Sequence, residues 1–233
     1  MKSGLKKFFK FGLTPLLLIV FIYIAYTTQF NYWRTLYFLK VAHEVVPKQY
    51  ELQSVPATTI TLVFNNIQLT VPWPEMTLSK VHQSYANWSF GNNQNSLAIF
   101  LSTTTARVVW SDNPDIENIL PINSLSSYEL ERMIWRVTKS ELPLWATKNN
   151  NAVKNLMLAG IKTAKYSWCD ELLEFQNTHD AKGVICEYVS NDGEKKSIVY
   201  FYLGDDDSEY NFFIKPNDIQ IRDGIIASIK RQQ

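Results

Sequence analysis

The chain has 233 residues, of which 46% are hydrophobic and 19% charged, and its formal net charge is +1. This length suits one globular domain with a short additional segment. A net charge so close to zero gives no support for a nucleic-acid partner, which would require a basic surface, and the sequence has no repeat or low-complexity tract typical of a solenoid or a disordered protein.

The first predicted element is an apolar helix. No residue from Phe11 to Trp33 is charged, and this segment would extend about 34 Å as a helix, against roughly 30 Å for the hydrocarbon core of a membrane. Thr14 can cap the helix, and Pro15 fits its first turn. Residues 11–33 are therefore predicted to cross a membrane.

Whether this segment is retained decides where the rest of the chain lies. A cleaved signal peptide ends in small residues, whereas bulky residues surround the only small pair here, Ala25 and Thr27. We expect a retained anchor, with a cleaved signal or a buried core helix as alternatives. Because four lysines lie in residues 1–10, the positive-inside rule places this tail in the cytoplasm and the domain outside the cytoplasmic (inner) membrane, in a periplasmic, extracellular or lumenal space.

Residues 34–55 are predicted to form a helical stalk or linker, because apolar residues recur at helical spacing up to Pro47, which would end the helix. Residues 56–233 are then the globular outer domain. Its first part is predicted to be a β-hairpin, in which "TITLVF" and "IQLTV" flank the turn residues Asn65-Asn66. A second pair of strands is expected around Asn87–Phe90 and Leu97–Ser102.

The middle of the domain is predicted to be helical. A short helix is expected to begin at Pro114 and run toward Leu120. A second helix, capped by Ser126 or Ser127, would be broken by Pro143. A third, short helix is expected from Asn151 to Leu158, ending near Gly160.

The last third is predicted to be a β-meander of "ELLEFQ", "GVICEYVS", "KSIVYFYL" and "EYNFFIK". The segment "SIVYFYL" is apolar on both faces, as is typical of a central strand covered on both sides. In the last strand, Tyr210, Phe212 and Ile214 alternate with Asn211 and Lys215, which predicts one buried face and one wetter face. "IQIRDGIIASIKR" is expected to form a closing helix.

This order of elements predicts an α+β fold, with an antiparallel β-sheet packed against helices. In its order of elements, its early "FNNIQLTVPWPEM" and its terminal "GIIASIK", the domain resembles the αβα sandwich of PsbP-like domains. That family includes photosystem subunits and many non-catalytic accessory proteins. The resemblance therefore implies an accessory role rather than a reaction, although a fold alone does not fix a function.

Cys169 and Cys186 are the only cysteines, and both follow the predicted anchor. An oxidising compartment favours a disulfide between them, with two free buried thiols as one alternative. A reactive Cys169, acting as the nucleophile of a thiol-dependent enzyme, is the other alternative. The spacing differs from a CxxC redox or zinc motif.

Tryptophans are the candidate binding residues. Trp73, held between two prolines, could protrude as a binding anchor, or it could pack over the sheet edge, and Trp88 is the second candidate. His43, His82 and His179 are interpreted as solvated residues. We predict no catalytic residue, no metal site and no cofactor.

Together these observations predict a single-pass membrane protein whose non-catalytic outer domain binds another membrane or envelope protein. Two alternatives remain open. An apolar pocket between the sheet and the helices would indicate a small-ligand-binding domain, and a reactive Cys169 would indicate an enzyme.

Overall fold

The computed structural model describes residues 33, 45–53, 60–103, 107–108, 114–142, 149–204 and 208–232. Apart from Trp33, the predicted membrane segment 11–33 lies outside these residues, and so does the predicted stalk as far as residue 44. In the part of the chain that is described, no helix is both long and apolar enough to cross a membrane.

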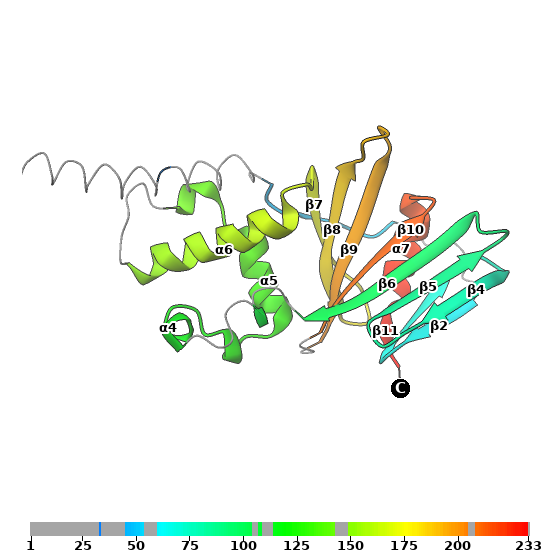
Figure 1. Cartoon of the computed structure of the whole chain (residues 1–233), viewed down its shortest axis with the longest axis horizontal. Coiled ribbons are helices and arrows are strands. Elements are labelled where there is room, and N and C mark those ends of the chain that lie inside the picture. The colour runs from blue at the N-terminus through cyan, green and yellow to red at the C-terminus, as the bar shows by residue number, and fades with distance from the viewer. Residues whose placement is uncertain are drawn as a thin grey trace, which may run out of the picture.

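The described residues form two sheets and several helices (Figure 1). The strands of the large sheet are β1 (Lys48–Gln49), β4 (Met76–Val81), β5 (Tyr85–Phe90), β6 (Asn95–Thr103), β7 (Glu171–Gln176), β8 (Ala181–Val189), β9 (Lys195–Leu203) and β10 (Ser208–Lys215). The strands of the small sheet are β2 (Ile60–Phe64), β3 (Ile67–Val71) and β11 (Lys230–Arg231). The helices are α4 (Pro114–Glu117), α5 (Ser127–Arg136), α6 (Asn150–Tyr166) and α7 (Ile219–Ser228), with short 3₁₀ turns η2 (Ile122–Ser124) and η3 (Lys139–Glu141).

The large sheet has the strand order β1-β7-β8-β9-β10-β6-β5-β4, and the small sheet has the order β11-β3-β2. Strand β1 runs parallel to β7, whereas the other neighbouring strands are antiparallel. This arrangement confirms the predicted α+β class. The hairpin of β2 and β3 is also confirmed, with Asn65 in the left-handed conformation (φ 52°) that tight turns use.

Strand β4 is an element that the sequence analysis missed. It begins two residues after Pro74 and forms one edge of the large sheet beside β5. All six of its residues are exposed, so burial imposes no clear alternation of apolar and polar side chains on its sequence.

Helix α5 begins where it was predicted. The Ser126 side chain accepts a hydrogen bond from the Glu129 amide, and the Glu129 carboxylate accepts one from the Ser126 amide, which forms a capping box. The helix ends at Arg136, before Pro143. The buried Lys162 ammonium donates to the carbonyls of Trp135 and Val137 at this end (2.7 and 2.9 Å).

The predicted end of helix α6 is wrong. We expected it near Gly160, but the helix continues to Tyr166. Ile161, Lys162 and Tyr166 all lie in its buried face. Burial of these side chains outweighs the modest helix penalty of one glycine.

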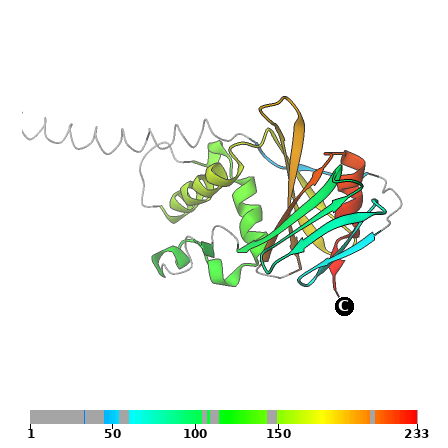
Figure 2. The same cartoon turned by 45° about the vertical axis from the view of Figure 1, so that its right-hand side comes forward.

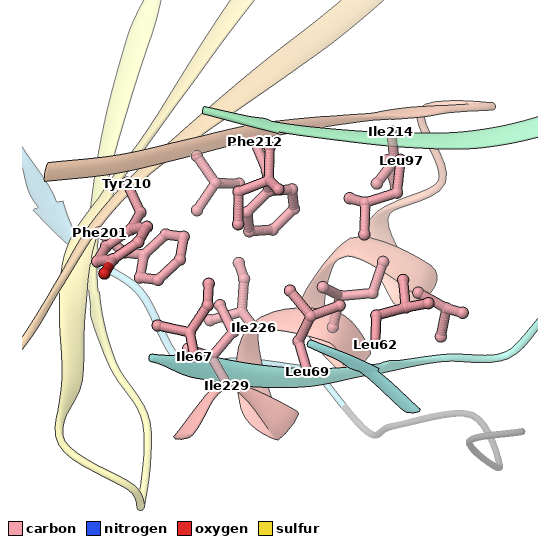
Figure 3. Close-up of a cluster of buried hydrophobic side chains, with 14 of the residues drawn as sticks. Leu62, Ile67, Leu69, Leu97, Phe201, Tyr210, Phe212, Ile214, Ile226 and Ile229 are labelled. Carbon is pink, nitrogen blue, oxygen red and sulfur yellow. The ribbon is translucent and has the colours of Figure 1, made fainter. Parts of the chain in front are cut away.

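One hydrophobic core lies between the large sheet and the layer made by the small sheet and α7. Figure 3 shows side chains of both layers pointing toward one another, with Phe201, Phe212 and Leu97 on one side and Ile67, Leu69 and Ile226 on the other. Since these residues alternate along their strands, the pattern predicted for β10 is confirmed: Tyr210, Phe212 and Ile214 are buried in this core.

A second core lies on the opposite face, where α5 and α6 cover β7, β8 and β9. Trp135 of α5 and Tyr166 of α6 pack with Tyr200 and Tyr202 of β9. Strand β9 is therefore covered on both faces, as predicted. These packed side chains lie between the helices and the sheet.

Residues 48–53 belong to the domain and not to the predicted stalk of residues 34–55. Strand β1 pairs with β7. The Tyr50 hydroxyl and the Gln53 amide both donate to Oδ2 of Asp223 in α7 (2.7 and 2.9 Å). The chain therefore joins the domain before residue 56, because the apolar pattern that predicted a helix ends at Pro47 and the residues after it pair with a sheet edge.

Two glycines should respond to alanine in opposite directions. A Cβ on Gly183 of β8 would lie 2.0 Å from the Tyr200 carbonyl oxygen, which belongs to the neighbouring strand, whereas a Cβ on Gly160 would meet nothing within 4 Å. We expect Gly183→Ala to lower the free energy of unfolding by about 1–3 kcal/mol or more. Gly160→Ala should raise it by roughly 0.5–1 kcal/mol. Urea denaturation of the two variants measures both changes, and equal effects would contradict this packing.

Candidate functional site

Half of one face of the large sheet carries exposed apolar side chains. On this face α5 and α6 bury the side chains of β7 to β9, while β10, β6, β5 and β4 extend away from these helices (Figure 2). Phe100 of β6 pairs with Asn211 of β10, and Asn211 pairs with Tyr200 of β9. Because paired residues on neighbouring strands point to the same face of a sheet, Phe100 lies on the same face as Tyr200, which belongs to the second core. Leu78, Phe100 and Phe213 on this face are 42%, 37% and 43% exposed. We call this half, made by β4, β5, β6 and β10, the open face.

Four stacked rings cross the open face. The ring centroids of His82 and Tyr85 are 4.4 Å apart, those of Tyr85 and Phe100 6.2 Å, and those of Phe100 and Phe213 5.8 Å. We call these four residues the aromatic row. Aromatic side chains are enriched at protein interfaces, because they offer a large rigid contact area. The open face can therefore bind an apolar surface.

Beside the aromatic row, strands β9 and β10 separate. They pair at three positions, Val199 with Phe212, Tyr200 with Asn211 and Phe201 with Tyr210. In contrast, β9 pairs with β8 along its whole length, and β10 does so with β6. The strands diverge between residues 195–198 of β9 and residues 213–215 of β10, a region that we call the fork.

A cleft of about 850 Å³ opens at the fork, within the range of about 300–1,000 Å³ that is typical of ligand sites. Its lining includes Tyr188, Ser197, Ile198, Phe213 and Asn217. Since Phe213 also belongs to the aromatic row, the cleft and the open face form one continuous site.

Polar contacts define one end of the cleft. The Asn217 side chain donates from Nδ2 to the Lys195 carbonyl (3.0 Å). The same side chain accepts at Oδ1 from the Ser197 hydroxyl (2.6 Å). Asn217 therefore connects the start of β9 to the segment that follows β10.

Both acidic and basic side chains border the site, with Asp192 and Glu194 beside Lys196 and Lys215. Lys196 pairs with Asp192 (2.9 Å), and hydrogen bonds from Ser190 and Lys196 hold the pKa of Asp192 well below its ordinary value. Lys80 on β4 and Lys215 on β10 are exposed and make no ion pair with any residue that the structure describes. Their charges are available to an acidic partner.

Cys169 and Cys186 are joined by a disulfide, with the sulfur atoms 2.06 Å apart. The bond connects the segment after α6 to β8, and both residues are buried in the second core. A disulfide-bonded Cys169 has no thiolate to act as a nucleophile. The alternative in which Cys169 is the nucleophile of a thiol-dependent enzyme therefore has no free thiol to support it.

Removing the disulfide should weaken the domain. For a loop of 17 residues, the chain-entropy model gives a loss of about 3 kcal/mol. We expect the Cys169→Ala/Cys186→Ala variant to show this loss in urea denaturation, and dithiothreitol should lower the unfolding midpoint of the parent chain but not that of the variant. A parent chain that is insensitive to the reductant would argue against the bond.

The tryptophans predicted to bind a partner are in the core. Trp73 is 6% exposed and Trp88 is 3% exposed, and both pack in the first core, with the Trp73 ring 5.1 Å from that of Phe90. The prediction that Trp73 protrudes is therefore wrong. Burying so large an apolar side chain is favourable, and Trp88 shares the core-facing side of β5 with Phe90.

The sequence contained one signal for the open face that the analysis did not use. In "EYNFFIK", Phe213 falls with Asn211 and Lys215 on the side of the strand predicted to be wetter. A phenylalanine at such a position indicates a contact surface. The fork depends on which strands pair and for how long, and a single strand's pattern does not contain that information.

The buried acidic residues do not form a catalytic site open to substrate. Glu131 and Glu209 lie in the second core with Lys165 between them, and their side chains are 0% and 4% exposed. Among the described residues, no group of three or more histidines, cysteines or acidic residues is placed to hold a metal ion. The three aspartates at 205–207 lie outside the described residues.

No protein-family model matches the sequence, and no curated protein sequence matches it.

Proposed function

We propose that this protein is a single-pass membrane-anchored, non-catalytic accessory protein whose extracytoplasmic α+β domain binds another membrane or envelope protein. The uncharged segment 11–33 and the four lysines before it support an anchor with a cytoplasmic N-terminus.

The disulfide supports a location of the domain outside the cytoplasm. Stable disulfides occur mainly in oxidising spaces outside the cytoplasm, and the bond between Cys169 and Cys186 is buried in the domain. The resemblance to PsbP-like domains supports an accessory role.

The observation that carries the binding role is the aromatic row on the open face. Monomeric proteins seldom expose large contiguous apolar patches without a function for them. Here stacked rings continue from β5 across β6 to β10, and a cleft adjoins them.

Site-specific photo-cross-linking in intact cells tests this role. A photoreactive phenylalanine analogue at Phe100 would sit in the open face. The same analogue at Ile219, which is 43% exposed on α7, provides a control, because α7 packs on the opposite face of the large sheet. We expect one discrete membrane-associated adduct from position 100 and none from position 219. Equal adducts from both positions, or none from position 100, would contradict the proposal.

A further inference from the structure

The chain enters the domain at one end of the large sheet. Strand β1 runs parallel to β7, with Lys48 level with Leu173, and the Lys48 ammonium lies 2.6 Å from Oε1 of Glu171, the first residue of β7. Val45 and Val46 precede β1, so they lie at the end of the sheet where β7 begins. Val45 packs against the second core there.

The end of α6 and the last residues of β8 lie at the same end of the sheet. The Asp170 amide, just before β7, donates to the Glu187 carbonyl, and the Asp170 carboxylate accepts from the Val189 amide (both 2.8 Å). The ring of Trp168, in the turn after α6, lies 4.8 Å from that of Tyr188. In Figure 1 these segments and the blue segment that includes β1 lie at the upper end of β7, β8 and β9.

Exposed apolar side chains gather at this end. Val46, Trp168 and Val189 are 45%, 38% and 55% exposed, and Tyr188 is half-buried beside Trp168. The Trp168 indole N–H donates to the Lys165 carbonyl (2.9 Å), which holds the ring in place. We call Val46, Trp168, Tyr188 and Val189 the entry patch. Tryptophan and tyrosine are enriched at the interface between a membrane and water.

The tether between the predicted anchor and this patch is short. Eleven residues, 34–44, separate Trp33, the last residue of the predicted membrane segment, from Val45. Fully extended, this stretch spans at most about 40 Å, and as the helix predicted for the stalk it would span about 18 Å. A domain of this size is itself roughly 40 Å across. The tether therefore keeps Val45, and the patch beside it, within about one domain diameter of the lipid.

We propose that the entry patch contacts the lipid surface of the membrane in which the chain is anchored, with Trp168 and Tyr188 at the level of the lipid headgroups. The proposal rests on the anchor in the proposed function and adds an orientation for the domain. Tyr188 and Phe213 line the same cleft, so the patch adjoins the open face. A partner on the open face would therefore lie close to the membrane surface, as a membrane protein does.

Charged residues of both signs border the entry patch. Lys48 pairs with Glu171, and Lys196, which is level with Tyr188, pairs with Asp192. Because these charges offset one another, the contact depends on aromatic and apolar side chains and needs no anionic lipid. Neutral phosphatidylcholine should therefore be sufficient for it.

Photo-cross-linking to lipid tests the contact on the full-length chain. A photoreactive phenylalanine analogue replaces Trp168, and the chain is reconstituted into vesicles of phosphatidylcholine alone. Val63 is the matched control position. It is 43% exposed, but Asn66 in the turn beside it accepts a hydrogen bond from the Tyr210 hydroxyl, toward the other end of the large sheet. We expect an adduct with the mass of one phospholipid from position 168 and none from position 63. Adding phosphatidylglycerol should change the yield by no more than about twofold.

Two variants test the neighbouring side chain. Tyr188→Glu places a charge in the entry patch and should lower the lipid adduct from position 168 about tenfold. Tyr85→Glu is the matched control, because Tyr85 lies in the aromatic row, and should leave the adduct within about twofold of the parent. If Tyr188→Glu fails to fold, photoactivatable phosphatidylcholine gives the same information on the unaltered chain. Its adducts should map to peptides that contain Trp168 or Val189, and not to β2.

The proposal is overturned if position 168 gives no lipid adduct in a chain that resists an alkaline carbonate wash, or if positions 63 and 168 react equally. Reaction of position 168 with protein in place of lipid also overturns it. Loss of the chain in the wash overturns the anchor, and this contact with it. A failure of partner binding alone would instead appear as no protein adduct from position 100 in cells, with the lipid adduct from position 168 intact.

Discussion

Replacing Lys165 by methionine is expected to lower the free energy of unfolding by about 3–5 kcal/mol, the range for a buried ion pair that loses one partner. The Lys165 ammonium lies 3.0 Å from Oε1 of Glu131 and also donates to Glu209. The three side chains are 9%, 0% and 4% exposed. Without the ammonium, two carboxylates remain in the second core with no opposing charge.

The pH dependence of this variant has a definite sign. Burial raises the pKa of Glu131 above its ordinary value, against the lowering effect of Lys165. Removing Lys165 removes that opposition, so the pKa of Glu131 should rise further. An acid whose pKa is raised on folding makes the folded state relatively more stable at low pH. The stability deficit of Lys165→Met should therefore shrink as the pH falls from about 7 toward the ordinary glutamate pKa of roughly 4.3.

Urea denaturation at a series of pH values measures both effects. Lys196→Met is the matched control. It removes a lysine paired with Asp192 at the surface, where the two side chains are 38% and 56% exposed, and should lower the free energy of unfolding far less than Lys165→Met does. Adding Glu209→Gln to Lys165→Met should recover part of the loss. Equal losses of stability for Lys165→Met and Lys196→Met would contradict the burial of Lys165 between Glu131 and Glu209.

Replacing Arg222 by methionine should also cost about 3–5 kcal/mol. Its guanidinium is 1% exposed and contacts Glu187 of β8 at 2.7 Å and the fully buried Asp223 at 3.1 Å. It also donates to the Tyr50 hydroxyl at 3.1 Å. The variant would leave Asp223 buried without its cation and weaken the contact between α7 and the segment that follows β1.

That contact connects the N-terminal segment to the rest of the domain, so its loss should have a local signature. Hydrogen exchange of the Gln53 amide, which donates to Asp223 at 2.9 Å, should speed up in Arg222→Met more than exchange in the hairpin of β2 and β3. Arg132→Met is the control, because Arg132 is 45% exposed and Glu174 keeps a second partner in Arg136. Unchanged exchange at Gln53 would contradict this role for Arg222.

Sequence patterns predicted elements wherever local chemistry decides the structure. Ser126 with Glu129 specifies a helix start through its own hydrogen bonds. Alternation in β10 follows from one buried face. The end of α6 was missed because packing of Ile161 and Tyr166 against the sheet overrides the local signal of Gly160. Strand β1 was missed because two exposed residues carry no periodicity.

The candidate site was harder to predict. It depends on which part of the sheet no helix covers and on which strands, far apart in the sequence, pair with one another. Trp73 and Trp88 attracted attention by residue type, yet their burial depends on the layer formed by β2, β3 and α7. Phe100 and Phe213 became candidates only when β6 and β10 were seen to pair outside the cover of α5 and α6.

The most direct test of the account is protease accessibility of the full chain in sealed membrane vesicles of both orientations. Vesicles with the extracytoplasmic face outward should lose residues 45–233 to added protease and keep a short N-terminal fragment that contains the intact segment 11–33. Inverted vesicles should protect the domain. A mature chain that starts after residue 33, or a domain that is digested only in inverted vesicles, would contradict a retained anchor with an extracytoplasmic binding domain.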